Sequence, residues 1–113
     1  MENTFDVRTK FCTYQNCRLY TSTYDANGGL YIGVVADCGD GMEPVMDVTV
    51  NVGAMAPAGC IAVKNHSENA GALDEMKRIG LVKEVIGSIQ SGFVKIPICR
   101  YDAEILERYR YRG

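Results

Sequence analysis

The first part of the chain alternates hydrophobic and polar positions in the way that β-strands do. Positions 5, 7, 9 and 11 are apolar or threonine, and the charged residues Asp6, Arg8 and Lys10 stand between them. A period of two residues places successive side chains on opposite faces of an extended strand. A second run, residues 18–24, is rich in threonine and tyrosine, which favour strands. The pattern predicts two antiparallel strands with a break at residues 15–16.

The middle of the chain continues the strand pattern. Residues 25–29 (Asp-Ala-Asn-Gly-Gly) favour a hairpin loop because Asn and Gly adopt positive φ at low cost. Residues 30–36 are almost continuously apolar, which predicts a central strand. A turn at 37–41 leads to a strand over 44–52, and after a loop a short strand follows over 60–64. These four or five consecutive strands predict an N-terminal meander.

The second half begins with the pattern of a helix. Asn69 is of a type that favours the N-cap, and Leu73, Met76 and Ile79 recur at the spacing of one helix face. Gly80 suits the C-terminal end of a helix. We therefore expect one main helix between Asn69 and Gly80.

After this helix the pattern is less regular. Residues 81–89 fit either a helix or a strand, although Gly87 argues against a long helix. Residues 93–101 predict a last strand. Because Pro97 lacks an N–H group, we expect it at a sheet edge or at a bulge.

The C-terminal end predicts a short helix that Asp102 caps, running from residue 103 to about 109. Together the elements predict a single α+β domain over residues 1–113. It contains an antiparallel β-sheet of about five to six strands with an N-terminal meander, one main helix and a short C-terminal helix. Residues 103–113 are expected to form that short helix and a frayed tail.

Length and composition fit this interpretation. The chain has 113 residues, of which 47% are hydrophobic and 23% charged, as in an ordinary globular domain. No apolar run approaches the ~20 residues of a membrane-spanning helix, and the N-terminus lacks the features of a secretory leader. We therefore expect a cytoplasmic protein without a membrane partner. The five cysteines, an odd number at irregular spacing, favour reduced thiols packed as small hydrophobic residues.

Charge is unevenly distributed, although the formal net charge is only −2. Between Arg18 and Lys64 the chain contains no lysine or arginine. Acidic residues do occur in that stretch, and hairpin loops project such residues away from the core. We expect an acidic partner-binding patch that consists of Asp25, Asp37, Asp40, Glu43 and Asp47.

The C-terminal end has the opposite character. Arginine and tyrosine alternate from Arg108 to Arg112, a combination that suits both single-stranded nucleic acid and protein hot spots. A solvated tail without a binding role is the alternative interpretation. The candidate partner- or nucleic-acid-binding residues at this end are Arg100, Arg108, Tyr109, Arg110, Tyr111 and Arg112.

The chain offers few residues for catalysis or metal binding. It has one histidine, His66, no tryptophan and no C-x-x-C pair, so we predict neither a metal nor a cofactor. No phosphate-binding loop, dinucleotide fingerprint or nucleophile elbow is present. A cysteine could still approach His66 in space and form a nucleophile–base pair. A solvated or loop-bonding histidine is the simpler interpretation, and we expect a protein that is not an enzyme.

Several short motifs resemble a known family. They are Gly80-Leu81-Val82, Gly87, Ser91-Gly92-Phe93, Pro97 and Arg100-Tyr101-Asp102, together with the earlier Thr49-Val50-Asn51-Val52 and Cys60-Ile61-Ala62-Val63-Lys64-Asn65. Over about residues 30–107 the chain resembles a domain-of-unknown-function family of proteins of about this length, carried by conjugative elements, plasmids and prophages of Firmicutes. It departs from the family pattern at Val85 and Ile86, where the family has proline and threonine. It also departs at residues 66–69, where the family favours asparagine–cysteine pairs. The resemblance implies no catalytic residue.

The resemblance implies a setting on mobile genetic elements, where small non-enzymatic proteins often block host defence. We therefore expect an interaction protein, an anti-defence inhibitor of the anti-CRISPR type. Its partner would be a protein, such as the basic nucleoprotein Cas9. The alternative is a nucleic-acid-binding accessory factor of plasmid or transposon maintenance that acts through the Arg/Tyr tail.

Overall fold

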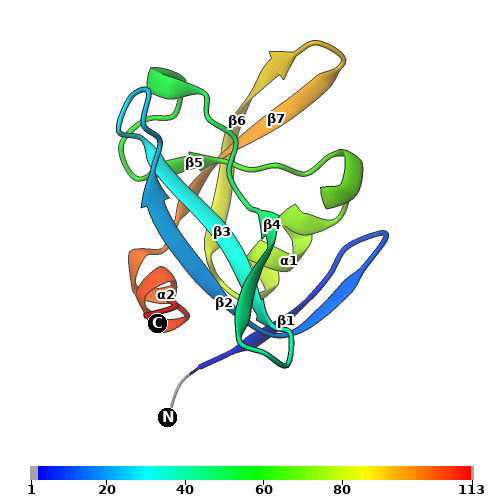
Figure 1. Cartoon of the computed structure of the whole chain (residues 1–113). Helices are drawn as coiled ribbons and strands as arrows, with labels where there is room; N and C mark the ends of the chain where they lie inside the picture. Colours follow the sequence, from blue (N-terminus) through cyan, green and yellow to red (C-terminus); the bar gives the residue numbers. More distant parts are fainter. Residues whose placement is uncertain (1–2, 113) are drawn as a thin grey trace.

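The computed structural model describes residues 3–112, which form two antiparallel sheets, two short α-helices and two 3-10 turns (Figure 1). The first sheet consists of β1 (Phe5–Arg8), β2 (Thr13–Thr23), β3 (Leu30–Asp37) and β4 (Met42–Asp47), hydrogen-bonded in that order. The second consists of β5 (Cys60–Ala62), β7 (Val94–Tyr101) and β6 (Val82–Ser91), with β7 in the middle. The helices are the 3-10 turns η1 (Gly53–Met55) and η2 (Ser67–Asn69), and the α-helices α1 (Ala72–Arg78) and α2 (Ala103–Arg108).

This arrangement confirms the predicted α+β class and the N-terminal meander. The structure has more strands than expected, because residues 81–89 belong mostly to strand β6 rather than to a helix. The fifth strand leaves the meander and pairs with β7 in the second sheet. No helix within residues 3–112 combines the length and the apolar character needed to cross a lipid bilayer.

A short connecting segment, residues 48–50, holds the two sheets together. The Val48 N–H donates to the Ile32 carbonyl of β3 at 2.9 Å, and the Val50 N–H donates to the Ala62 carbonyl of β5 at 2.9 Å. Thr49 forms a bridge with Val63 between these two bonds. The fourth strand was predicted over residues 44–52, but β4 ends at Asp47. The residues that follow it form this connecting segment instead.

The hydrophobic core lies between the two sheets. Its fully buried side chains come from both sheets, from the connecting segment and from α1: Val7, Leu19, Ile32, Val34, Val48, Val63, Met76 and Leu81. Helix α1 packs against both β1 and β6 and covers the core between them. A smaller cluster around Ile96 and Ile98 lies under Val50 and Val52, on the other face of the second sheet.

The first strand is shorter than the alternating pattern predicts. β1 ends at Arg8, and the next residues form a turn in which the Thr9 hydroxyl accepts from the N–H groups of Phe11 and Cys12. Side-chain bonds of this kind compete with strand pairing. Phe11 is consequently 66% exposed instead of facing the core.

The predicted N-cap is also wrong. Helix α1 begins at Ala72 behind Gly71, whose φ of 99° lies in the left-handed region that favours glycine. Asn69 is buried, and its amide donates to the Asp47 and Lys64 carbonyls at 2.5 and 3.3 Å. The residue therefore ties the loop to the end of β4 and does not cap the helix. Asp102, by contrast, accepts from the N–H groups of Glu104 and Ile105 and caps α2 as predicted.

Pro97 lies in the central strand β7, neither at an edge nor at the irregularities of the β6–β7 pairing, which fall between Val82 and Glu84 and between Val85 and Gly87. This position is tolerated because β5 is short and its pairing ends at Ile98. Beyond that point the Pro97 carbonyl accepts from the Val63 N–H at 2.9 Å. On the other side, Pro97 lies opposite Ser88 of β6.

The C-terminal segment is ordered against the sheet, in contrast to the predicted frayed tail (Figure 1). The Leu19 N–H donates to the Tyr109 carbonyl at 2.8 Å, and the Tyr111 N–H donates to the Leu19 carbonyl at 2.6 Å. The Tyr109 ring packs edge-on against Phe5 with a centroid distance of 5.0 Å. Residues 109–111 thus cover the edge of β2 beyond Cys17, which lies opposite Phe5 at the start of β1. Gly113 lies outside the described residues.

Deleting residues 109–113 is expected to lower the free energy of unfolding by about 2–4 kcal/mol, because a half-buried aromatic ring and two backbone hydrogen bonds are lost. Urea denaturation followed by circular dichroism measures the change. Deleting residues 112–113 is the matched control and should cost less than about 0.5 kcal/mol. Equal stability of the two truncated proteins would show that the segment does not belong to the fold.

Candidate interaction surfaces

Three of the predicted acidic residues lie together at the turn between β3 and β4. Asp37 ends β3, Asp40 lies in the turn, and Glu43 lies on β4 opposite Ala36; all three are exposed. The turn is closed by a hydrogen bond from the Cys38 N–H to the Gly41 carbonyl, at 3.0 Å. The Asp37 carboxylate also accepts from the Gly39 N–H at 2.9 Å, which holds this carboxylate at the turn. We call residues 37–43 the acidic turn.

The acidic turn has no counter-ion among the described residues. Within residues 3–112, no lysine or arginine forms an ion pair with Asp37, Asp40 or Glu43. The pKa of the Cys38 thiol is raised by desolvation and by the nearby carboxylates of Glu43 and Asp37. Desolvation and the negative charge of these carboxylates both disfavour the thiolate.

The other two acidic residues lie elsewhere, so the five do not form one patch. Asp25 is in the β2–β3 turn at the opposite end of β3, which at roughly 3.3 Å per residue is on the order of 20 Å away. Asp47 accepts a hydrogen bond from the Tyr31 hydroxyl at 2.6 Å. Burial and this bond raise the pKa of Tyr31 well above its ordinary value. Asp47 therefore already has a partner within the fold.

The basic and aromatic candidates are also divided among different places. Arg100 lies on β7 in the second sheet and pairs with Glu84 of β6 at 3.2 Å. Arg108 is exposed at the end of α2, and Tyr109 packs against the core. None of these three residues is among those that line the groove formed by the rest of the predicted tail site.

The remaining three candidates lie beside strand β2, a neighbour that the sequence analysis did not predict for them. Arg110, Tyr111 and Arg112 line a shallow groove of about 420 Å³ together with Tyr20 and Thr21 of β2. Arg110 and Arg112 both pair with Glu107, the former at 3.5 Å. Pairing of the C-terminal segment with β2 is what builds this groove.

Comparison with protein families gives one match, which covers residues 18–113, most of the chain. The chain belongs to the family described as Domain of unknown function (DUF4313). Searches of curated proteins and of solved structures give no match. The matched region of this DUF4313 domain contains both sheets apart from β1 and the start of β2, and it includes the acidic turn and the groove.

Sequence reasoning missed an exposed apolar element of the DUF4313 domain. The β6–β7 hairpin extends from the body of the molecule (Figure 1), and Phe93 at its tip is fully exposed. Gly92 precedes it with a φ of 60°, as expected at the first position of a tight hairpin turn. On the edge strand β6, Val85 and Ile86 are 43% and 49% exposed. The signal in the sequence was Phe93 directly after the Ser91-Gly92 turn, since a residue at a hairpin tip is exposed.

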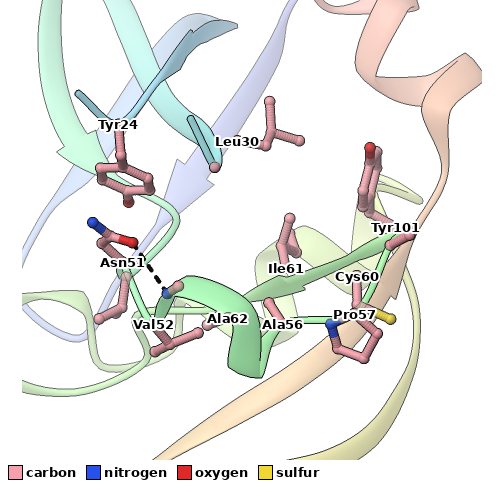
Figure 2. Close-up of a pocket in the computed structure, with 15 residues that line it drawn as sticks. Tyr24, Leu30, Asn51, Val52, Ala56, Pro57, Cys60, Ile61, Ala62 and Tyr101 are labelled. Carbon is pink, nitrogen blue, oxygen red and sulfur yellow. Dashed lines mark hydrogen bonds between the residues drawn. The ribbon is translucent and has the colours of Figure 1, made fainter. Parts of the chain in front are cut away.

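Figure 2 shows a small hollow of about 210 Å³ between the β2–β3 hairpin, the loop that contains η1, and β5. Asn51 at its wall accepts from the Gly53 N–H at 3.2 Å, and the Tyr24 hydroxyl bonds to Thr49. The described residues that line the hollow carry no charged side chain. Its titratable side chains are those of Tyr24, Cys60 and Tyr101.

His66 does not form a hydrogen-bonded pair with a cysteine among the described residues. It is partly buried ahead of η2. Its Nδ1 atom is enclosed without a hydrogen-bond partner among the described residues. No group of three or more histidine, cysteine or acidic side chains within residues 3–112 is arranged to hold a metal ion.

The five thiols differ in exposure. Cys17 and Cys99 are buried, and desolvation raises the pKa of each to about 11. Cys60 is partly buried, whereas Cys12 and Cys38 are exposed. The predicted packing of thiols in the core therefore holds for Cys17 and Cys99 and is wrong for Cys12 and Cys38.

In native protein at about pH 8, a thiol reagent is expected to modify Cys12 and Cys38 first and to leave Cys17 and Cys99 unmodified. A pKa of about 11 leaves only about one thiolate in a thousand at this pH, and burial blocks access as well. Mass spectrometry of labelled peptides identifies the sites, with urea-unfolded protein as the control in which all five react. Labelling of Cys17 as fast as Cys12 in the native state would contradict the placement of Cys17 in the core.

Proposed function

We propose that this DUF4313 domain is a non-enzymatic interaction protein that binds a basic partner protein through its acidic turn. The observation that carries the proposal is the group of three exposed carboxylates at residues 37–43, which no described cation neutralises. An uncompensated charge cluster on a fixed turn attracts an oppositely charged surface and accelerates association.

The acidic turn is favoured over the C-terminal arginines as the main contact. Arg110 and Arg112 already share Glu107, whereas the carboxylates of the turn have no such partner among the described residues. Short connections also hold Asp37 and Glu43 in place, since the turn closes on the paired ends of β3 and β4. A preorganised charge loses less entropy on binding than one on a mobile tail.

The specific form that we propose is the inhibition of a host-defence nuclease in the cytoplasm, by a protein carried on a mobile genetic element. A guide-loaded nuclease such as Cas9 holds nucleic acid in a strongly basic channel, which is a suitable target for the acidic turn. The sequence resemblance to proteins of mobile elements supports this form.

Three carboxylates alone account for specificity and association rate rather than for tight binding. The apolar neighbours of the acidic turn, Met42, Val45 and Tyr31, are half-buried, and Val45 packs against the core. The exposed Phe93 is the better source of affinity, because a single aromatic side chain often dominates an interface. The hairpin tip and the acidic turn lie at opposite ends of the view in Figure 1, so only a large partner could contact both.

Replacing Asp40 and Glu43 by lysine is expected to slow association with guide-loaded Cas9 on the order of tenfold at low salt, and to weaken the salt dependence. Asp37 is kept because it holds the turn. The measurement is the association rate at low and at physiological salt, together with inhibition of DNA cleavage. The matched control, Asp25→Lys with Asp74→Lys, makes the same charge change at other exposed positions.

The proposal is contradicted if the two double variants slow association equally or not at all. Absence of binding to every guide-loaded nuclease in a panel would instead remove the anti-defence form. The acidic contact would then be supported only if another basic protein bound the chain and this binding required Asp40 and Glu43.

Replacing Phe93 by serine is expected to leave the free energy of unfolding within about 0.5 kcal/mol, because the ring has no contacts to lose. Binding to the partner should weaken roughly tenfold or more, mainly through faster dissociation. Thermal unfolding and dissociation kinetics measure the two effects. Replacing the exposed Phe11 by serine is the control, and an equal loss of binding there would show that neither phenylalanine is a specific contact.

A further inference from the structure

The outer face of the first sheet carries a row of tyrosine rings. Leu19 of β2 points into the core, so the next residue, Tyr20, points outward and is 43% exposed. Its ring lies edge-to-face with that of Tyr31 on β3, at a centroid distance of 6.3 Å. Tyr31 in turn contacts Tyr24 in the same manner at 5.7 Å. Tyr20 is thus the exposed end of a fixed aromatic row.

The C-terminal segment brings a fourth ring and two guanidinium groups to this end of the row. Its position is set by the backbone hydrogen bonds of Leu19 to Tyr109 and Tyr111, so Arg110, Tyr111 and Arg112 follow the edge of β2. Together with Tyr20 they line the groove of about 420 Å³, a volume within the range of small-ligand sites. The groove is therefore part of the fold and not a property of a mobile tail.

The groove carries a surplus of positive charge. Two guanidinium groups, of Arg110 and Arg112, share the single carboxylate of Glu107. All three side chains are between 44% and 60% exposed. Ion pairs this exposed contribute little free energy, about 0–1 kcal/mol, so an incoming anion can replace the carboxylate at low cost.

We infer that this groove binds single-stranded nucleic acid, with backbone phosphates at Arg110 and Arg112 and a base stacked on Tyr20. Arginine next to an exposed aromatic ring is the combination with which proteins hold single strands, because the ring stacks on any base and the guanidinium binds phosphate. The site is confined to this end of the row, since the Asp47 carboxylate at Tyr31 and Asp25 at the far turn repel a phosphate backbone. This inference does not rest on the acidic turn, and the two surfaces are tested separately.

The test uses fluorescently labelled oligonucleotides of about eight nucleotides, both oligo(dT) and mixed-sequence RNA, titrated with the full chain across a salt series. Fluorescence anisotropy gives the affinity. Replacing Arg110 and Arg112 by glutamine should weaken binding on the order of tenfold or more and reduce the slope of log K against log salt by about 1–2. Arg100→Gln with Arg108→Gln removes the same charge from outside the groove and should change the affinity much less.

Two further variants separate a groove from general charge attraction. Tyr20→Ala should weaken binding at least fivefold, about the loss of one stacking contact, whereas Tyr20→Phe keeps the ring and should bind as the original chain does. Glu107→Gln should tighten binding several-fold, because it removes the carboxylate that competes for Arg110 and Arg112. All these side chains are exposed, and circular dichroism shows that each variant is folded.

The inference is overturned if the oligonucleotides do not bind at low salt, or if Arg100→Gln with Arg108→Gln weakens binding as much as the groove variant. It is also overturned if Tyr20→Ala has no effect. A labelled polyglutamate peptide is titrated in parallel. If this peptide binds with the same dependence on Arg110 and Arg112 and the oligonucleotides do not, the groove recognises acidic protein segments instead.

Discussion

The structure depends on the backbone of residues 48–50, which hydrogen-bonds to β3 on one side and to β5 on the other. Without this segment the four-stranded meander and the three-stranded sheet would each leave an apolar face unpaired. With it, side chains from both sheets bury each other, and Val48 lies fully buried between them. A chain of this length can build one core but not two. The link between the sheets is therefore the condition for a stable fold.

Backbone hydrogen bonds between distant segments also cover the edge of β2. β1 covers only the first part of this long strand, and an unpaired strand edge is prone to pairing with other chains. Residues 109–111 take over at Leu19, so the last residues of the chain close the sheet that the first residues begin. Closing the edge in this way also places two arginines and a tyrosine beside Tyr20. A structural requirement and a candidate binding groove therefore share the same hydrogen bonds.

The two charged surfaces follow different physical rules. The acidic turn stays uncompensated because it projects from the paired ends of β3 and β4, where no described cation reaches it. The arginines of the groove lie close to α2, whose Glu107 partly neutralises them. The acidic turn is suited to attracting a basic protein, and the groove to exchanging a weak internal ion pair for a phosphate.

Local patterns determined much of the fold. The alternation of polar and apolar positions, the Asn-Gly-Gly turn and the Asp102 cap predicted the α+β class, the meander and α2, because each depends on residues close in sequence. The charges at residues 37–43 also predicted the acidic turn, since a hairpin loop exposes its own side chains. Tertiary structure alone decided the rest. The placement of Asn69, the central position of Pro97 and the pairing of Leu19 with Tyr109 and Tyr111 all depend on hydrogen bonds between distant segments. No local propensity encodes such partners, so the sequence named Arg110, Tyr111 and Arg112 as candidates, but only the folded chain brings them to Tyr20.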